Sequence, residues 1–178
     1  MADQLFYAHG IHAVGVEAIV AQSGTAKTTL YDHFGSKDEL IAAYLRRRAA
    51  SWRAYVEAQL GSHEGAPVER ILQVYDLLGR SLVDPGFRGC PFTNACAEFD
   101  ADHPAATVAR EHRRWLRDTF AQLGGEAGAS APERLAAQLL MLYDGAMVAA
   151  HVDRDRGAAV SATAAAAALM RAESCLGT

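Results

Sequence analysis

The chain has 178 residues, which is enough for one large domain or for one small and one medium-sized domain. Hydrophobic residues make up 51% of it, ample for a buried core, yet no apolar run reaches the ~18 residues of a membrane span. The N-terminus lacks the basic start and apolar run of a secretory signal peptide. Three cysteines without a zinc-site spacing, Cys90, Cys96 and Cys175, indicate reduced thiols, so we expect a cytoplasmic protein with no membrane partner.

The formal net charge of −4 does not by itself favour binding to nucleic acid. Residues 1–45 hold two lysines against five carboxylates, a local net charge of −3. This balance argues against tight non-specific DNA binding, whose strength follows the number of phosphates that are neutralised. Helix N-termini and hydroxyl groups also bind phosphates, however, and the three arginines at residues 46–48 follow directly.

A pair of short helices is predicted near the N-terminus, after residues 2–9, which form the end of a helix. Apolar residues recur at spacings of three and four over residues 16–20, and Gly24 should end that helix in the left-handed conformation. A further helix is expected over residues 26–34, with Thr25 as its N-cap. Two helices joined by a glycine turn are the pattern of a helix-turn-helix.

The predicted helix 26–34 has two different faces. Leu30 and Phe34 lie four residues apart and should face the core. The remaining positions carry cations, hydroxyls and rings, the groups that meet phosphates and base edges, at Lys27, Thr28, Thr29, Tyr31 and His33. A merely solvated helix face is the alternative interpretation.

The string G-T-A-K-T-T-L-Y-D-H-F-G-S-K-D-E-L, residues 24–40, resembles the DNA-binding signature of the tetracycline-repressor (TetR) family of transcriptional regulators. The resemblance covers about the first quarter of the chain. It implies that four side chains contact phosphates, namely Thr29, Tyr31, His33 and Lys37. Lys27 and Thr28 would lie near the start of the recognition helix, where base-reading side chains belong, with phosphate contact alone as the alternative. The family's first helix is longer, so we expect the natural chain to begin upstream of Met1.

One long helix is predicted to link two domains, residues 1–45 and residues 46–178. Ser36 as N-cap and Glu39 three residues later form a capping box. From there a helical stripe runs to residue 60, which corresponds to roughly 37 Å at ~1.5 Å per residue. The remaining chain matches helices over residues 67–82, 92–99, 104–123, 132–150 and 158–170, so the fold class is all-α.

The last two predicted helices indicate a homodimer. Residues 132–150 are apolar around most of the helix circumference, which requires partners on all sides. Residues 158–170 are nearly all alanine, so neighbouring backbones can approach closely. We therefore expect the helices around 132–150 and 158–175 to pack against a second copy as a four-helix bundle.

A ligand pocket is the second predicted feature of the larger domain. Ligand sites are mostly apolar with a few placed polar groups. Such groups fall on the central helices and a loop, at Tyr75, Phe87, Phe92, Asn94, His112, Trp115, Tyr143 and Asp144. Glu98 is a further polar candidate. Ordinary core packing is the alternative for each aromatic residue, and it is favoured for His112 as a hydrogen-bonded core histidine.

Catalysis has little support in the sequence. Cys90 or Cys96 with His103 or His112 would imitate a nucleophile and its base, but no positioned third group is visible. The acidic residues around position 100 are interpreted as caps for the following helix, not as metal ligands. We therefore predict that the chain is not an enzyme and holds no cofactor or metal.

The resemblance implies a ligand-responsive DNA-binding transcriptional regulator. We expect a repressor that binds a palindromic operator in double-stranded DNA as a homodimer and is released by a small-molecule effector. The alternative is a dimeric helical small-molecule-binding protein whose DNA-binding unit is no longer competent. The local charge of −3 and the short first helix favour that alternative.

Overall fold

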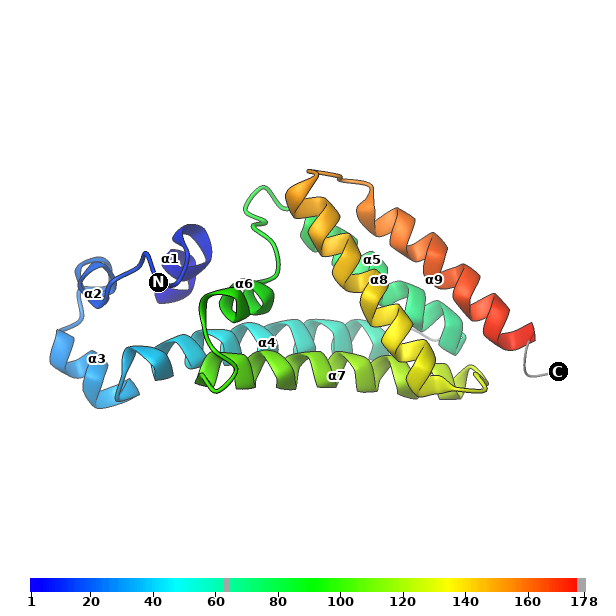
Figure 1. Cartoon of the computed structure of the whole chain (residues 1–178), viewed down its shortest axis with the longest axis horizontal. Coiled ribbons are helices and arrows are strands. Elements are labelled where there is room, and N and C mark those ends of the chain that lie inside the picture. The colour runs from blue at the N-terminus through cyan, green and yellow to red at the C-terminus, as the bar shows by residue number, and fades with distance from the viewer. Residues whose placement is uncertain (63–64, 176–178) are drawn as a thin grey trace. The chain divides into compact units, whose positions relative to one another are not determined.

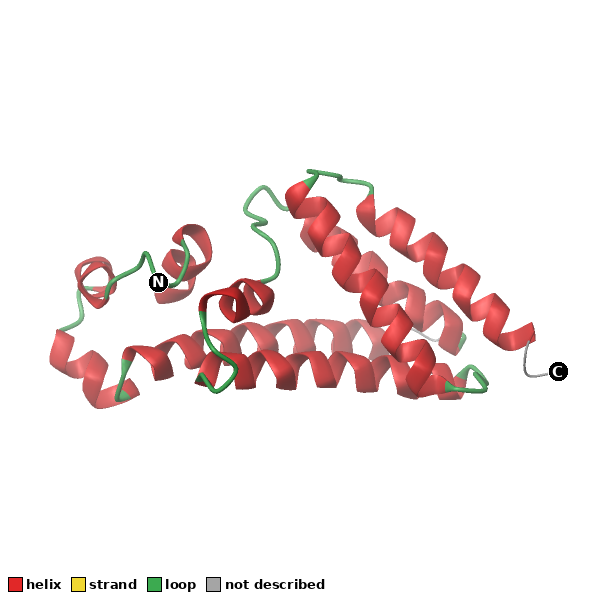
Figure 2. Ribbon diagram, viewed as in Figure 1, coloured by secondary structure: helices red, strands yellow, loops and turns green. Residues whose placement is uncertain are grey.

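The computed structural model describes residues 1–62 and 65–175, and all regular structure in that part of the chain is helical (Figures 1 and 2). The all-α prediction is confirmed. The described helices are α1 (Ala2–His9), α2 (Val16–Ser23), α3 (Lys27–Phe34), α4 (Lys37–Gly61), α5 (Pro67–Leu82), α6 (Pro91–Glu98), α7 (Pro104–Glu126), α8 (Pro132–Val152) and α9 (Ala158–Cys175).

The helices fall into two compact units that do not follow the order of the chain. The first unit combines Met1–Trp52 with Cys90–His112, so it contains α1, α2, α3 and α6. The second combines Arg53–Gly89 with the described residues from Arg113 onward, and it contains α5, α8 and α9. The long helices α4 and α7 each contribute to both units, which a pattern of local helix signals does not reveal.

The first unit has an apolar core beneath the two short helices. Ile19 of α2, Leu30 of α3 and Ile41 of α4 belong to one buried cluster. Gly24 ends α2 in the left-handed conformation with a φ of 67°, as the sequence predicted. Ser36 is the N-cap of α4, because its Oγ accepts a hydrogen bond from the Glu39 amide at 3.1 Å. The Glu39 carboxylate contacts Arg46 instead of completing the predicted capping box.

The start of α3 differs from the prediction by one residue. The helix begins at Lys27, and Ala26 is the N-cap, without a side-chain hydrogen bond. Thr25 is therefore one position too early to cap α3, and its amide donates to the Ser23 hydroxyl at 3.3 Å. The predicted Thr25 cap is wrong because the extended backbone of Ala26 separates that side chain from the first helical turn.

The second unit packs α5, α8 and α9 against one another. Tyr75 is fully buried on α5, and its hydroxyl donates to the Leu139 carbonyl of α8 at 2.6 Å. A Cβ added at Gly79 would lie 3.0 Å from the Ala159 Cβ, so α5 and α9 approach closely where small residues face each other. By length and composition alone, α8 would suit a membrane span, a property that core helices of water-soluble proteins share.

Candidate nucleic-acid interface

Helix α3 presents its polar face to solvent. Leu30 is buried at 5% exposure, and burial of a leucine side chain contributes about 2 kcal/mol to holding the helix on the core. The candidate DNA-binding residues on this helix are all exposed, namely Lys27, Thr28, Thr29, Tyr31 and His33. Tyr31 is a large aromatic side chain with 38% of its surface accessible. A helix held by one apolar side and free on its polar side is available to enter a DNA groove.

Lys27 forms an ion pair at the start of α3. Its Nζ lies 2.7 Å from the Glu17 carboxylate of α2. The hydrogen bond between them raises the pKa of Lys27 and lowers the pKa of Glu17 from their ordinary values. Both side chains are exposed, so the pair is weak and open to exchange. A phosphate or a guanine edge can therefore replace Glu17 as the partner of Lys27.

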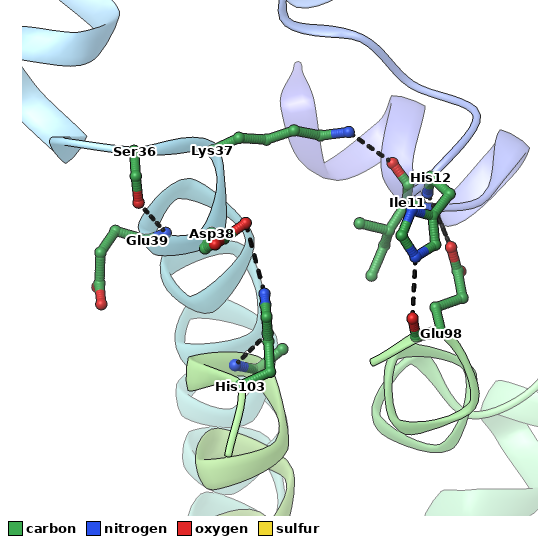
Figure 3. Close-up of polar contacts among 9 residues, drawn as sticks. Ile11, His12, Ser36, Lys37, Asp38, Glu39, Glu98 and His103 are labelled. Carbon is green, nitrogen blue, oxygen red and sulfur yellow. Dashed lines mark hydrogen bonds and ion pairs between the residues drawn. The ribbon is translucent and has the colours of Figure 1, made fainter. Parts of the chain in front are cut away.

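Lys37 occupies a different environment from the other candidates. It is half-buried, and its Nζ donates a hydrogen bond to the Ile11 carbonyl at 3.2 Å (Figure 3). The ammonium group thus faces the loop between α1 and α2. Its role as a phosphate contact stays a prediction, and that contact would compete with the bond to Ile11.

The acidity of residues 1–45 is largely balanced by nearby cations. Arg48 forms a bidentate ion pair with the Asp3 carboxylate, at 2.8 and 3.0 Å. Its guanidinium also lies 3.9 Å from the centre of the Tyr7 ring. Arg46 contacts Glu39 at 3.3 Å. Adding the three arginines of residues 46–48 to the net charge of −3 brings residues 1–48 to zero. The local charge is therefore a weaker obstacle to DNA binding than residues 1–45 alone indicate.

The candidate ligand residues do not all belong to one unit. Phe92, Asn94 and His112 lie in the first unit. The Phe92 and His112 rings are stacked, with centroids 4.0 Å apart and an interplanar angle of 15°. His112 is buried, whereas Asn94 is exposed on α6. The stacked pair matches the core-packing alternative for these two residues.

The other candidate ligand residues lie in the second unit: Tyr75, Phe87, Trp115, Tyr143 and Asp144. The Tyr75 and Tyr143 rings meet edge to face at 6.3 Å inside the core. Asp144 pairs with Arg113 at 2.8 Å, and the Arg53 guanidinium lies 5.1 Å from the Trp115 ring centre. Phe87 meets the His151 ring edge to face at 6.3 Å. Their ligand-binding role stays a prediction.

Glu98, a candidate polar group of a ligand pocket in the sequence analysis, contacts the backbone of the α1–α2 loop. Its two carboxylate oxygens accept the backbone amides of Ile11 and His12, at 3.2 and 2.8 Å (Figure 3). These bonds tie the carboxylate to the α1–α2 loop, and a role for Glu98 in a ligand pocket stays a prediction. Backbone amides carry no side-chain signature, so residue types gave no signal for these contacts.

The two cysteines whose side chains are described lie in different surroundings. Cys90 is half-buried and Cys96 is exposed, and the side chain of Cys175 lies outside the described residues. The Cys90 sulfur accepts the Thr93 amide at 3.5 Å and so caps the start of α6. Within the described residues, no three His, Cys, Asp or Glu side chains are grouped to hold a metal ion.

Comparison with known proteins identifies the class to which this geometry belongs. Residues 1–44 match the family model described as bacterial regulatory proteins of the tetR family, and residues 67–166 match the tetracyclin repressor-like C-terminal domain. A TetR-family transcriptional regulator from Streptomyces coelicolor has a solved structure with a TM-score of 0.91 and 36% identity, covering 97% of this chain and 92% of its own.

Two further proteins are similar. The structure of a TetR transcriptional regulator from Streptomyces avermitilis gives a TM-score of 0.85 and 31% identity, covering 97% of this chain and 94% of its own. The HTH-type transcriptional activator FasR of Mycolicibacterium smegmatis is 44% identical over 46 residues, which is 26% of this chain and 21% of that protein's length. The chain therefore belongs to the TetR family. It is a DNA-binding transcriptional regulator, and the family is not one of enzymes.

Proposed function

We propose that this regulator is a cytoplasmic repressor that binds a palindromic operator as a homodimer and is released by a small-molecule effector. The observation that carries the proposal is the exposed polar face of α3 above a buried Leu30. Residues 1–45 would form the DNA-binding domain, and residues 46–178 the domain for the effector and the second copy. The activator FasR, similar over 46 residues, makes the sign of regulation a question for experiment.

The DNA contacts divide into two kinds in this proposal. Lys27 and Thr28, in the first turn of α3, would read base edges in the major groove. The phosphate contacts would be Thr29, Tyr31, His33 and Lys37. Phosphate contacts fix the position of the protein on the duplex, whereas base contacts give the sequence preference.

An exposed apolar surface on α8 and α9 supports the homodimer. Met141, Val148 and Val152 are 71%, 56% and 68% exposed and follow one face of α8. Val160, near the start of α9, is 73% exposed. Large apolar side chains gathered on a surface mark a site of association. A two-fold dimer would present two copies of α3 to half-sites separated by one or more helical turns of DNA.

Release by an effector follows from differential binding. A ligand held by the candidate pocket residues would favour a conformation in which the two recognition helices no longer match the half-sites. By reciprocity, the operator would weaken binding of that ligand by the same factor.

The test is a titration of the protein against the DNA upstream of its own gene at two salt concentrations. We expect specific binding that weakens as salt increases, because each phosphate contact releases counterions. Transcription from that DNA in vitro then separates a repressor from an activator. If a chain extended upstream of Met1 also binds no DNA, the helical small-molecule-binding protein is the better description.

A further inference from the structure

The loop between α1 and α2 is held by charged side chains from two other helices. Glu98, the last residue of α6, accepts the Ile11 and His12 amides with its two carboxylate oxygens, at 3.2 and 2.8 Å. Lys37, the first residue of α4, donates to the Ile11 carbonyl at 3.2 Å. The His12 Nε2 lies 2.9 Å from the Glu98 carbonyl oxygen. We name these four residues, Ile11, His12, Lys37 and Glu98, the loop clamp (Figure 3).

The loop clamp fixes both polar groups of one peptide segment. The Ile11 amide faces a carboxylate, its carbonyl faces an ammonium group, and its side chain is buried at 3% exposure. Hydrogen bonds with an ionised partner are shorter and stronger than those between neutral groups. A segment bonded on both sides and anchored by its side chain has little freedom to rotate.

Aromatic and acidic groups brace the same region a second time. The Phe99 ring, one residue after Glu98, lies 4.8 Å from the His12 ring and is stacked on the His103 ring at 3.9 Å. The His103 Nε2 lies 3.4 Å from the Asp38 carboxylate, and its Nδ1 accepts the Ala105 amide at 3.1 Å. Asp38 follows Lys37 in the first turn of α4, so that turn is tied both to the loop and to the start of α7.

The loop leads directly into the helix-turn-helix. Residues 10–15 end α1 and enter α2, which packs on α3. The loop therefore contributes to the orientation of α2 and α3, together with their buried residues such as Ile19 and Leu30. Of the clamp's side chains, Glu98 supplies the contacts to two consecutive amides, and it comes from a segment 86 residues away in the chain.

We propose that Glu98 is a positioning residue for DNA binding, which holds the α1–α2 loop so that α3 has the orientation that fits the operator. Glu98 itself does not contact DNA. This inference rests on the proposed function, because it names a residue that controls whether α3 is oriented to bind the operator. When the clamp opens, the fraction of molecules with a competent α3 falls, and the apparent operator affinity falls by that fraction.

The experiment compares Glu98→Ala and Glu98→Gln with Glu111→Gln in the full chain. Glutamine keeps one acceptor oxygen but turns an amide donor toward the second backbone N–H, so its effect should be intermediate. Glu111 is an exposed carboxylate on α7 in the same unit and serves as the matched control. Two quantities are measured, namely hydrogen exchange at the Ile11 and His12 amides and affinity for operator and scrambled DNA.

We expect exchange at these two amides to accelerate in Glu98→Ala while amides of the buried core keep their protection. Operator affinity should fall about tenfold, which corresponds to a competent fraction near one in ten. Affinity for scrambled DNA should change less, since it depends on charge more than on orientation. Glu111→Gln should leave all of these quantities unchanged.

Two results would overturn the inference. Unchanged exchange at Ile11 and His12 in Glu98→Ala means that the contacts do not hold the loop in solution. Faster exchange with unchanged or stronger operator binding means that the clamp does not position α3. If Glu98→Ala does not fold, Glu98→Gln is judged by the same two readouts. A wild-type chain that binds no DNA is a separate result, because it removes the proposed function itself.

Discussion

The proposed recognition helix α3 and the proposed dimer helix α8 both have exposed side chains, but the chemistry of the two surfaces is opposite. Tyr31 and its neighbours on α3 are polar or charged, and Leu30 is the buried residue that fastens the helix. On α8 the exposed large apolar residues are Met141, Val148 and Val152, while Leu135, Leu139 and Tyr143 are buried on another side. One surface suits a hydrated polyanion, and the other suits a second apolar surface.

This difference teaches how the two associations should respond to solution conditions. Contacts with phosphates weaken as salt increases, because the counterions that binding releases are then plentiful. Burial of apolar surface does not depend on charge, so dimerisation should change little over the same salt range. Measuring DNA binding and dimerisation at two salt concentrations therefore tests whether α3 binds DNA and α8 binds a second copy.

The largest expected effect comes from placing a charge on the apolar surface of α8. Val148→Asp should convert the proposed dimer to a monomer, because a carboxylate would have to be buried against apolar side chains. A monomer reads one half-site, so operator affinity should fall at least about a hundredfold with the loss of bivalent binding. Light scattering measures the mass, and a DNA titration measures the affinity.

Val83→Asp is the matched control for that variant. Val83 is 49% exposed just after α5 and is not part of the α8 surface. It should leave both mass and affinity unchanged. A Val148→Asp chain that remains a dimer would place the interface elsewhere.

The next effect separates base reading from phosphate contact on α3. Lys27→Ala should lower affinity for the operator about tenfold but change affinity for scrambled DNA much less, as expected for a base contact. Tyr31→Ala should lower both affinities alike, since a phosphate contact carries no sequence information. Competition titrations with the two DNAs measure the ratio. Equal losses for Lys27→Ala on both DNAs would remove Lys27 from base reading.

A smaller effect of opposite sign is expected at Glu17. Glu17→Gln should strengthen DNA binding about threefold, because it releases Lys27 and removes one like charge facing the phosphates. The gain should shrink as salt increases. Glu57→Gln, at an exposed carboxylate of α4, is the control and should have no effect. Weaker binding by Glu17→Gln would mean that Glu17 aims Lys27 at the DNA.

Helices were predictable from the sequence because their signals are local. Gly24, Ser36 and the predicted helix starts at residues 67 and 132 are ends that the structure confirms. The error at Thr25 was also local. Thr25 is the better N-cap by residue type, but the backbone places Ala26 at the cap position.

Contacts between distant segments were not predictable. Nothing in the residue types indicates that Glu98 bonds to amides 86 and 87 residues earlier, or that Lys37 turns toward a carbonyl. From sequence alone, the carboxylate of Glu98 fits a ligand pocket as well as it fits a contact with backbone amides. The division of the chain into two units was not predictable for the same reason. Helix α6 and the first part of α7 are distant from the N-terminal helices in sequence but belong to the same unit.

The smallest predicted effect concerns the polar contacts that fasten α9 to the start of α8. Glu173 is buried and accepts hydrogen bonds from Arg134 and Ser130 at 2.9 and 3.1 Å. The bond from Arg134, followed by that from Ser130, holds the pKa of Glu173 below its ordinary value of 4.5 despite its burial. The folded state therefore favours the ionised form, and this stabilisation is fully present above the unfolded pKa and lost as pH falls through the folded pKa.

Glu173→Gln should consequently lower stability toward urea at neutral pH, and the difference from the wild type should shrink as pH falls below the ordinary pKa of 4.5. Equilibrium unfolding at neutral pH and across the acidic range measures this difference, with Glu111→Gln as the exposed control. The change should leave the dimer intact, because the apolar surface at Val148 does not depend on this charge. If Glu173→Gln instead dissociated the proposed dimer, the apolar surface of α8 would depend on the polar contacts between α8 and α9. Association through α8 would then depend on charge, as DNA binding through α3 does.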